Sequence, residues 1–158
     1  MSILQKAYSA WRFFAGKPEE REPMEPSFEQ QVLLEAHKLL IEKLVNSIPG
    51  SYITDKWNCP HKLSVQRYVL HSKDARELLD IHLHYGEFTF TSPHQVTGQT
   101  VRIGVGHPDV FNVPIKIAQL IDNYYKVLDS GNKLQIKRAH HRAKQVMSNL
   151  RKAYHEIS

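Results

Sequence analysis

The spacing of apolar residues changes twice along this chain, and that order limits the folds it can adopt. Residues 28–48 carry apolar side chains at helical intervals, residues 63–106 include several alternating segments, and residues 112–157 return to helical spacing. A period of two is typical of strands with one buried face. The order predicts an α+β fold: N-terminal helices, a central antiparallel sheet of three or four strands, and a C-terminal αα-hairpin with a long basic amphipathic last helix.

The helix expected from residue 28 has a clear starting signal. Ser27 follows Pro26 and stands three positions before Gln30, which is the arrangement of a capping box. The helix is expected to run to about Ile48 and to stop at the following Pro-Gly pair. Its apolar residues cover more than one stripe, so we expect a mostly buried helix at the centre of the core.

The middle of the chain contains the strand candidates. Residues 63–71, 81–85, 87–91 and 100–106 alternate between apolar and polar side chains, and turn residues separate the last two segments. Between the first two, Asp74 is expected to cap a helical turn. A competing interpretation is a single helix from Asp74 to Tyr85.

The N-terminal segment differs in composition from the rest. Residues 1–17 predict a short amphipathic helical arm, and residues 18–27 are rich in proline and glutamate, which predicts an extended linker. Residues 28–158 have the size of one compact α+β domain. The single cysteine and the lack of an apolar run of about 20 residues favour a cytoplasmic protein without a transmembrane segment.

Positive charge is concentrated at the two ends of the chain. Residues 1–17 carry a net charge of +3 and residues 132–158 a net charge of +6, whereas residues 18–131 carry −4. Such asymmetry bears on the partners of a protein rather than on its fold.

The last predicted helix, from about Lys133, separates apolar from basic residues. At about 100° per residue, its apolar positions fall on one arc. These positions are Ile136, Ala139, Ala143, Val146, Met147, Leu150, Ala153, Tyr154 and Ile157. The opposite side carries cations, and no acid precedes Glu156, so the ion pairs common on soluble helices are missing. The candidate phosphate contacts are Lys137, Arg138, Arg142, Lys144, Arg151 and Lys152.

Three kinds of partner suit such a helix: nucleic acid, an acidic protein surface or an anionic membrane. A solvated cationic face, which also complements the negative end of the helix dipole, is the alternative. The leading hypothesis is a small non-enzymatic regulatory protein that contacts DNA or RNA backbone, because counterion release rewards each neutralised phosphate. The exposed arc offers few amide side chains for reading bases, so strong sequence specificity is not expected.

The N-terminal arm supports a second hypothesis, an interaction adaptor or inhibitor. Trp11, Phe13 and Phe14 are its candidate anchors, because buried aromatic residues commonly dominate protein interfaces. The arm can also pack on its own domain, or lie on a membrane surface, since aromatic residues beside lysine and arginine suit all three environments.

Histidine and cysteine spacing suggests a third hypothesis, a His-dependent metal hydrolase. His82 and His84 lie two positions apart, so a strand would place both on one face. Cys59 and His61 form another pair, and zinc accepts both ligand types. Nothing local joins the two pairs, so we assign no metal and no catalytic residue.

Residues 103–109 place glycines after a strand and before a helix, as phosphate-binding loops do. However, Asp109 stands where the dinucleotide fingerprint requires its third glycine, and Pro108 removes a backbone donor. Gly104 and Gly106 are better explained by a tight exit from the strand, and no cofactor is assigned.

Overall fold

The chain forms one five-stranded antiparallel sheet with helices before and after it. The computed structural model describes residues 27–58, 65–92 and 99–155. The elements are helix α2 (Phe28–Ser47), strands β1 (Tyr52–Asn58), β2 (Val65–His71), β3 (Glu77–His84), β4 (Glu87–Thr91) and β5 (Thr100–Gly104), and helices α3 (Asn112–Ser130) and α4 (Lys133–His155). The α+β class is as predicted, although the sheet has five strands rather than three or four.

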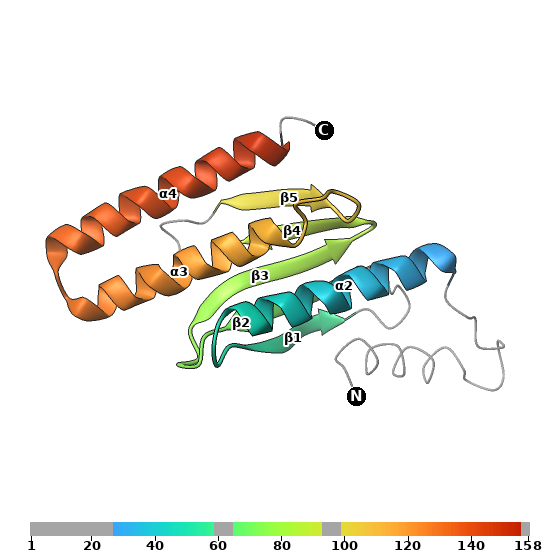
Figure 1. Ribbon diagram of the computed structural model, residues 1–158, viewed down its shortest axis with the longest axis horizontal. Coiled ribbons are helices and arrows are strands. Elements are labelled where there is room, and N and C mark those ends of the chain that lie inside the picture. The colour runs from blue at the N-terminus through green and yellow to red at the C-terminus, as the bar shows by residue number, and fades with distance from the viewer. Residues whose placement is uncertain (1–26, 59–64, 93–98, 156–158) are drawn as a thin grey trace.

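The sheet is a simple meander in which each strand pairs with the next one along the chain (Figure 1). In the register of the central strands, Ile81 of β3 lies opposite Tyr68 of β2 on one side and Phe90 of β4 on the other. Strands β3 and β4 are joined by Tyr85 and Gly86, whose φ angles of 48° and 86° are both positive. Two such residues in succession match the right-handed twist of a hairpin.

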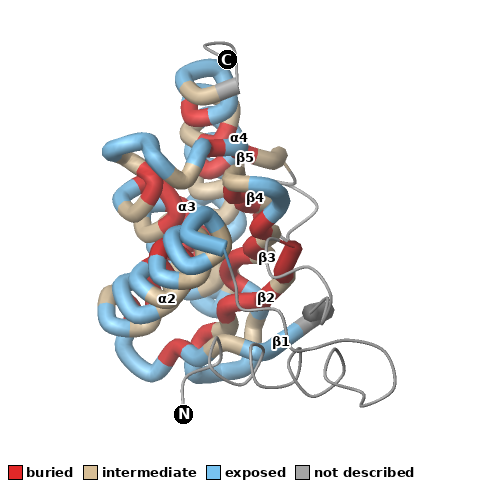
Figure 2. The backbone as a smooth tube through the Cα atoms, turned by 90° about the vertical axis from the view of Figure 1, so that its right-hand side faces the viewer, coloured by how far each residue is buried: buried red, intermediate tan, exposed pale blue. Residues whose placement is uncertain are grey.

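The helices and the sheet form two layers around one core. Figure 2 shows α2 and α3 on one side of the sheet and α4 beside β5, with buried residues along the boundary between the helices and the strands. Helix α3 contacts β3, and α4 contacts both α3 and the edge strand β5. Alternate residues of the strands point into this core, among them Leu79, Ile81, Leu83, Phe88 and Phe90, which are fully buried. Each such side chain stabilises the fold by about 1.5–3 kcal/mol.

The opposite face of the sheet carries polar pairs across neighbouring strands. Arg67 of β2 donates two hydrogen bonds to Asp80 of β3, at 3.0 Å from Nε to Oδ1 and 2.6 Å from Nη2 to Oδ2. The hydroxyls of Thr91 and Thr100 lie 3.0 Å apart between β4 and β5. Cross-strand pairs of this kind fix the register of a sheet whose second face is polar.

Two expectations about strands were wrong. Strand β1 was missed, and the segment after Asp74 is not a helical turn, because β3 already begins at Glu77. Instead, Ser72 and Arg76 close a tight turn: the Ser72 amide donates to the Arg76 carbonyl at 2.8 Å, and Ala75 adopts a φ of 66°. Pairing with β2 on one side and β4 on the other outweighs the local helix preference of this segment.

Helix α2 begins as the sequence predicts. The Gln30 amide donates to the Ser27 hydroxyl oxygen at 3.2 Å, and the Ser27 amide donates to the Gln30 side chain at 2.9 Å, which completes the capping box. The expected burial was wrong, however. Only Ala36, His37, Leu40 and Leu44 are buried within the helix, and Phe28, Val32 and Leu39 are exposed. Helix α2 therefore buries one stripe, and among the described residues a second apolar face of the helix is exposed.

His37 is a fully buried histidine in this stripe. Its ring lies 4.5 Å from the ring of Tyr68 and 5.8 Å from that of Phe88, measured between centroids. Neither ring nitrogen has a hydrogen-bond partner among the described residues, and nor does the Tyr68 hydroxyl. Burial without a partner disfavours the charged ring, and it lowers the pKa of His37 from 6.5 to about 3.

We expect His37 to make the fold sensitive to acid. The folded protein holds the ring neutral, whereas the unfolded chain takes up a proton below its pKa of 6.5, so stability falls as the pH drops from 6.5 towards 3. Between pH 7.5 and pH 5, the loss of unfolding free energy from His37 should be about 2 kcal/mol. Urea denaturation at both pH values, compared with the variant His37→Leu, isolates this contribution. An equal loss in both proteins would contradict it.

Candidate functional site

The basic helix α4 is positioned by a tight αα-hairpin. Helix α3 ends at Ser130, and Gly131 follows in the left-handed conformation, with a φ of 70° and its amide donating to the Leu128 carbonyl. Asn132 then caps α4, because its side-chain oxygen accepts a hydrogen bond of 3.2 Å from the Gln135 amide. The start of α4 at Lys133 is as predicted. Gly131 and Asn132 thus determine the direction in which α4 leaves α3.

One stripe of α4 packs on the domain. Ala143, Met147 and Leu150 are buried, and α4 contacts both α3 and β5. Near the C-terminal end, the Tyr154 hydroxyl donates to an oxygen of Asp109 at 2.8 Å. Of the residues predicted to lie on the apolar arc, Ala153 is exposed instead, and Ile157 lies outside the described residues. Most of the arc is therefore confirmed, and it turns the opposite side of the helix outward.

All six predicted phosphate contacts are exposed. They are Lys137, Arg138, Arg142, Lys144, Arg151 and Lys152. Within residues 27–58, 65–92 and 99–155, no carboxylate forms an ion pair with any of them. The charge of this helix is therefore not neutralised by the described part of its own domain.

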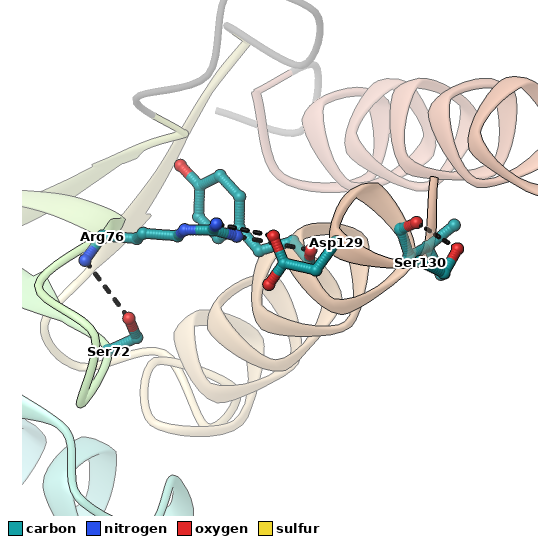
Figure 3. A network of polar contacts seen from close by, with 6 residues as sticks. Ser72, Arg76, Asp129 and Ser130 are labelled. Atoms are coloured by element: carbon teal, nitrogen blue, oxygen red, sulfur yellow. Dashed lines mark hydrogen bonds and ion pairs between the residues drawn. The ribbon is translucent and has the colours of Figure 1, made fainter. Parts of the chain in front are cut away.

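The acids of the neighbouring helix α3 have other partners. Asp129 accepts a hydrogen bond of 2.6 Å from Arg76, which lies between β2 and β3 (Figure 3). The same guanidinium donates to the Tyr125 carbonyl at 3.4 Å and stacks over the Tyr125 ring at 5.2 Å. Asp122 pairs with Lys126 one turn further along α3, at 3.2 Å. The Arg76–Asp129 pair attaches α3 to the turn between β2 and β3, and neither pair involves a cation of α4.

The six cations spread over about half of the circumference of α4 rather than one narrow face, and Lys152 lies between two flanks that the other five form. Relative to Ile136, rotation by 100° per residue places Lys137, Lys144 and Arg151 within about 40° of one another. Because they are seven residues apart, they form a straight row with about 10.5 Å between neighbours. Arg138 and Arg142 lie on the other flank, beside α3.

The second flank borders a cleft that the sequence did not reveal. This cleft between α3 and α4 has a volume of about 280 Å³. Its lining residues are Leu120, Asn123, Tyr124, Val127, Arg138, Ala139 and Arg142. Arg138 and Arg142 of α4 therefore line this small cleft together with Asn123 of α3. Only the packing of the two helices brings these side chains together.

The position of the cations along α4 shows how far the helix dipole alone accounts for them. A helix has a positive N-terminal and a negative C-terminal end, so Arg151 and Lys152 stabilise it and Lys133 and Lys137 do not. The first turn contains no acid. The helix dipole therefore accounts for the cations near the C-terminal end of α4 but not for those near its N-terminal end. The N-terminal cations are unfavourable for the isolated helix.

The other candidate residues give no comparable site. His82 and His84 do lie on one face of β3, with ring centroids 6.2 Å apart. Burial, and then the nearby Arg67, lower the pKa of His82. Across the described residues, no group of three or more histidine, cysteine, aspartate or glutamate side chains is arranged to hold a metal ion.

Several predicted residues lie outside the described part of the chain. The candidate anchors Trp11, Phe13 and Phe14 precede residue 27, and Cys59 and His61 fall between β1 and β2. The hypotheses that rest on them, a partner-binding arm and a zinc site, stay predictions.

The glycine-containing loop after β5 has a structural role in the fold. The backbone carbonyl of Asp109 accepts hydrogen bonds of 3.1 Å from the amides of Asn112 and Val113, at the start of α3. Its carboxylate accepts the hydrogen bond from Tyr154 of α4. Asp109 thereby links the loop after β5 to α3 and α4. Its negative charge also makes this loop unsuitable for a phosphate.

Comparison of the chain with family models, curated proteins and solved structures found no match. Within the described part of the chain, none of the helices has the length and apolar character that crossing a bilayer requires. The residues of α4 and their surroundings are therefore the basis for inferring a function.

Arg138 should cost the free protein some stability, because Arg142 lies one turn away on the same flank. Replacing Arg138 by Gln removes this repulsion, and replacing it by Glu creates a favourable pair with Arg142. The three residues have similar helix propensities, so the charge effect should dominate. We expect the free energy of unfolding to rise in the order wild type, Arg138→Gln, Arg138→Glu, by about 0.5 kcal/mol in total.

Chemical denaturation at low and high salt checks this order. The differences should shrink in about 1 M salt, where the Debye length is about 3 Å. A ranking that is unchanged by salt would show that packing, and not charge, causes it.

Proposed function

We propose that this protein binds the backbone of nucleic acid through α4, with little dependence on base sequence. The observation that carries the proposal is the row of Lys137, Lys144 and Arg151, exposed on a packed helix and without ion pairs to the described carboxylates. Release of condensed counterions favours the contact of each cation with a phosphate.

The spacing of the row supports a regular polyanion as the partner. At 1.5 Å per residue, α4 is about 34 Å long, which is comparable to about ten base pairs of a duplex. Neighbouring cations in the row are separated by about one Debye length at physiological salt, so each acts almost independently. A chain of evenly spaced phosphates can meet all of them without a change in the shape of the helix.

The burial of the apolar stripe argues against a membrane. Interfacial helices insert their apolar side among lipid chains while basic residues contact the headgroups. In α4, Ala143, Met147 and Leu150 are covered by the domain. Insertion would require the helix to leave α3 and β5.

An acidic protein is a weaker fit than nucleic acid. Protein interfaces depend on large aromatic anchors that become buried at their centre. The outward side of α4 offers no tryptophan or phenylalanine, and Tyr154 already donates to Asp109. Leu134 is its only strongly exposed large apolar residue among those described. Binding would depend on charge alone, for which phosphates are the most regular source.

The proposal predicts strong dependence on salt. We expect the full-length protein to bind a labelled duplex of about 20 base pairs at low salt, as measured by fluorescence anisotropy. The triple variant Lys137→Glu, Lys144→Glu, Arg151→Glu should lose this binding in low salt. Milder replacement of the same three residues by Gln should reduce the slope of log K against log salt by about 3.

A matched control carries the same change in net charge at residues outside α4. Lys43, Lys73 and Lys116 are exposed residues of α2, the β2–β3 turn and α3, and replacing all three by Glu should retain most of the binding. Equal losses in the two triple variants would mean that only net charge matters. Absence of binding by the wild-type protein to both DNA and RNA at low salt would refute the proposal.

Weak dependence on sequence follows from the side chains of the exposed arc. Gln135, Gln145 and Asn149 are the exposed amides of α4. Discrimination of about 1–3 kcal/mol per base pair needs a well-placed bidentate contact, and the row contains none. We expect duplexes of unrelated sequence to bind with affinities within about threefold of one another. A preference above about a hundredfold for one sequence would contradict backbone recognition.

A further inference from the structure

A large apolar groove lies along the N-terminal half of α2. Its volume is about 1080 Å³, and it extends from α2 to the β3–β4 turn and the loop after β5. The groove is apolar because Phe28, Val32, Leu39, Tyr85, Val105 and Phe111 line it. Exposed apolar residues are ordinary when scattered, but a continuous patch of this kind marks a binding surface.

The exposure of these side chains is unusual for a helix that packs on a sheet. Phe28 is 79% exposed, Val32 45% and Leu39 43%, and Tyr85 on the other wall is 59% exposed. The charged residues that line the groove are Glu29 and Glu35, and no lysine or arginine lines it among the described residues. An occupant of suitable chemistry is therefore an apolar segment with positive charge at its edges.

The chain itself contains such a segment immediately before α2. The amphipathic helix predicted in residues 3–15 has Ile3, Ala7, Trp11 and Phe14 on one side. Residues 1–17 contain three cations and no acid. Apolar character and charge both match the groove.

We propose that residues 3–15 dock as a helix in the groove of the same molecule. Their length as a helix would be about 18 Å, and the groove side of α2 from Phe28 to Leu39 spans about 17 Å. Residues 16–26 connect the two and can reach about 36 Å when extended, so the helix can dock in either direction. Because the tether is short, the effective concentration of the segment at the groove is in the millimolar range.

Docking would control access to the aromatic residues of the arm. Trp11 and Phe14 lie on the side that would enter the groove, whereas Phe13 is about 100° away from Phe14 around the helix. A protein partner that uses Trp11 as an anchor would therefore compete with the groove for it. The groove is separate from the cations of α4, so this inference does not depend on nucleic-acid binding.

Tryptic cleavage after Arg12 in the full-length protein tests the docking. A docked helix resists protease, and Val32→Asp places a charge in the apolar groove. Valine and aspartate have similar helix propensities, and Val32 is partly exposed, so α2 should remain folded. We expect cleavage after Arg12, followed by mass spectrometry, to be about tenfold faster in the variant.

Asn46→Asp is the matched control, because it adds an aspartate to an exposed position of α2 outside the groove. It should leave the cleavage rate unchanged, and Phe28→Asp should act like Val32→Asp. Equal rates in the wild type and both groove variants would overturn the proposal. Protection that increases with protein concentration would overturn it as well, since it would place the arm in a second copy of the chain.

Discussion

The packing of α4 against α3 and β5 is the interaction on which the properties of this protein depend. Burial of side chains such as Met147 and Leu150 contributes about 1.5–3 kcal/mol each. The unfavourable placement of cations near the helix N-terminus and their mutual repulsion cost only about 0.3–1 kcal/mol per site. Burial therefore wins, and the helix keeps a charge pattern that it could not tolerate alone. The same packing determines which side of the helix faces outward.

The fold class could be predicted because the periodicity of the sequence is strong at both ends. The capping box of Ser27 and Gln30 and the glycine turn before Lys133 are local signals, and both helix starts were correct. The extent of the sheet was less predictable. Residues 77–80 resemble a helix locally and become part of β3 only through pairing with β2 and β4. The partial burial of α2 also depends on neighbours that no local pattern specifies.

The candidate site was predictable in composition but not in arrangement. Helical geometry alone identified the exposed cations, since one stripe of α4 had to be buried. Whether acids elsewhere in the fold neutralise them depends on tertiary contacts. Asp129 is distant from Arg76 in sequence, and only the packing of α3 on the sheet joins them. The cleft between Asn123 and Arg142 likewise arises from the crossing of two helices.

The meander order of the sheet has a consequence for how the protein forms. Every strand pairs with its neighbour in the chain, so no β-pairing has to wait for a distant segment. Low separation between contacting residues generally accelerates folding, because little loop entropy is lost before contacts form. During synthesis, the hairpins can assemble one after another as the chain emerges. Helix α4, made after the sheet, then packs against the edge strand β5, and packing of a helix at an edge strand disfavours strand-to-strand association between molecules there.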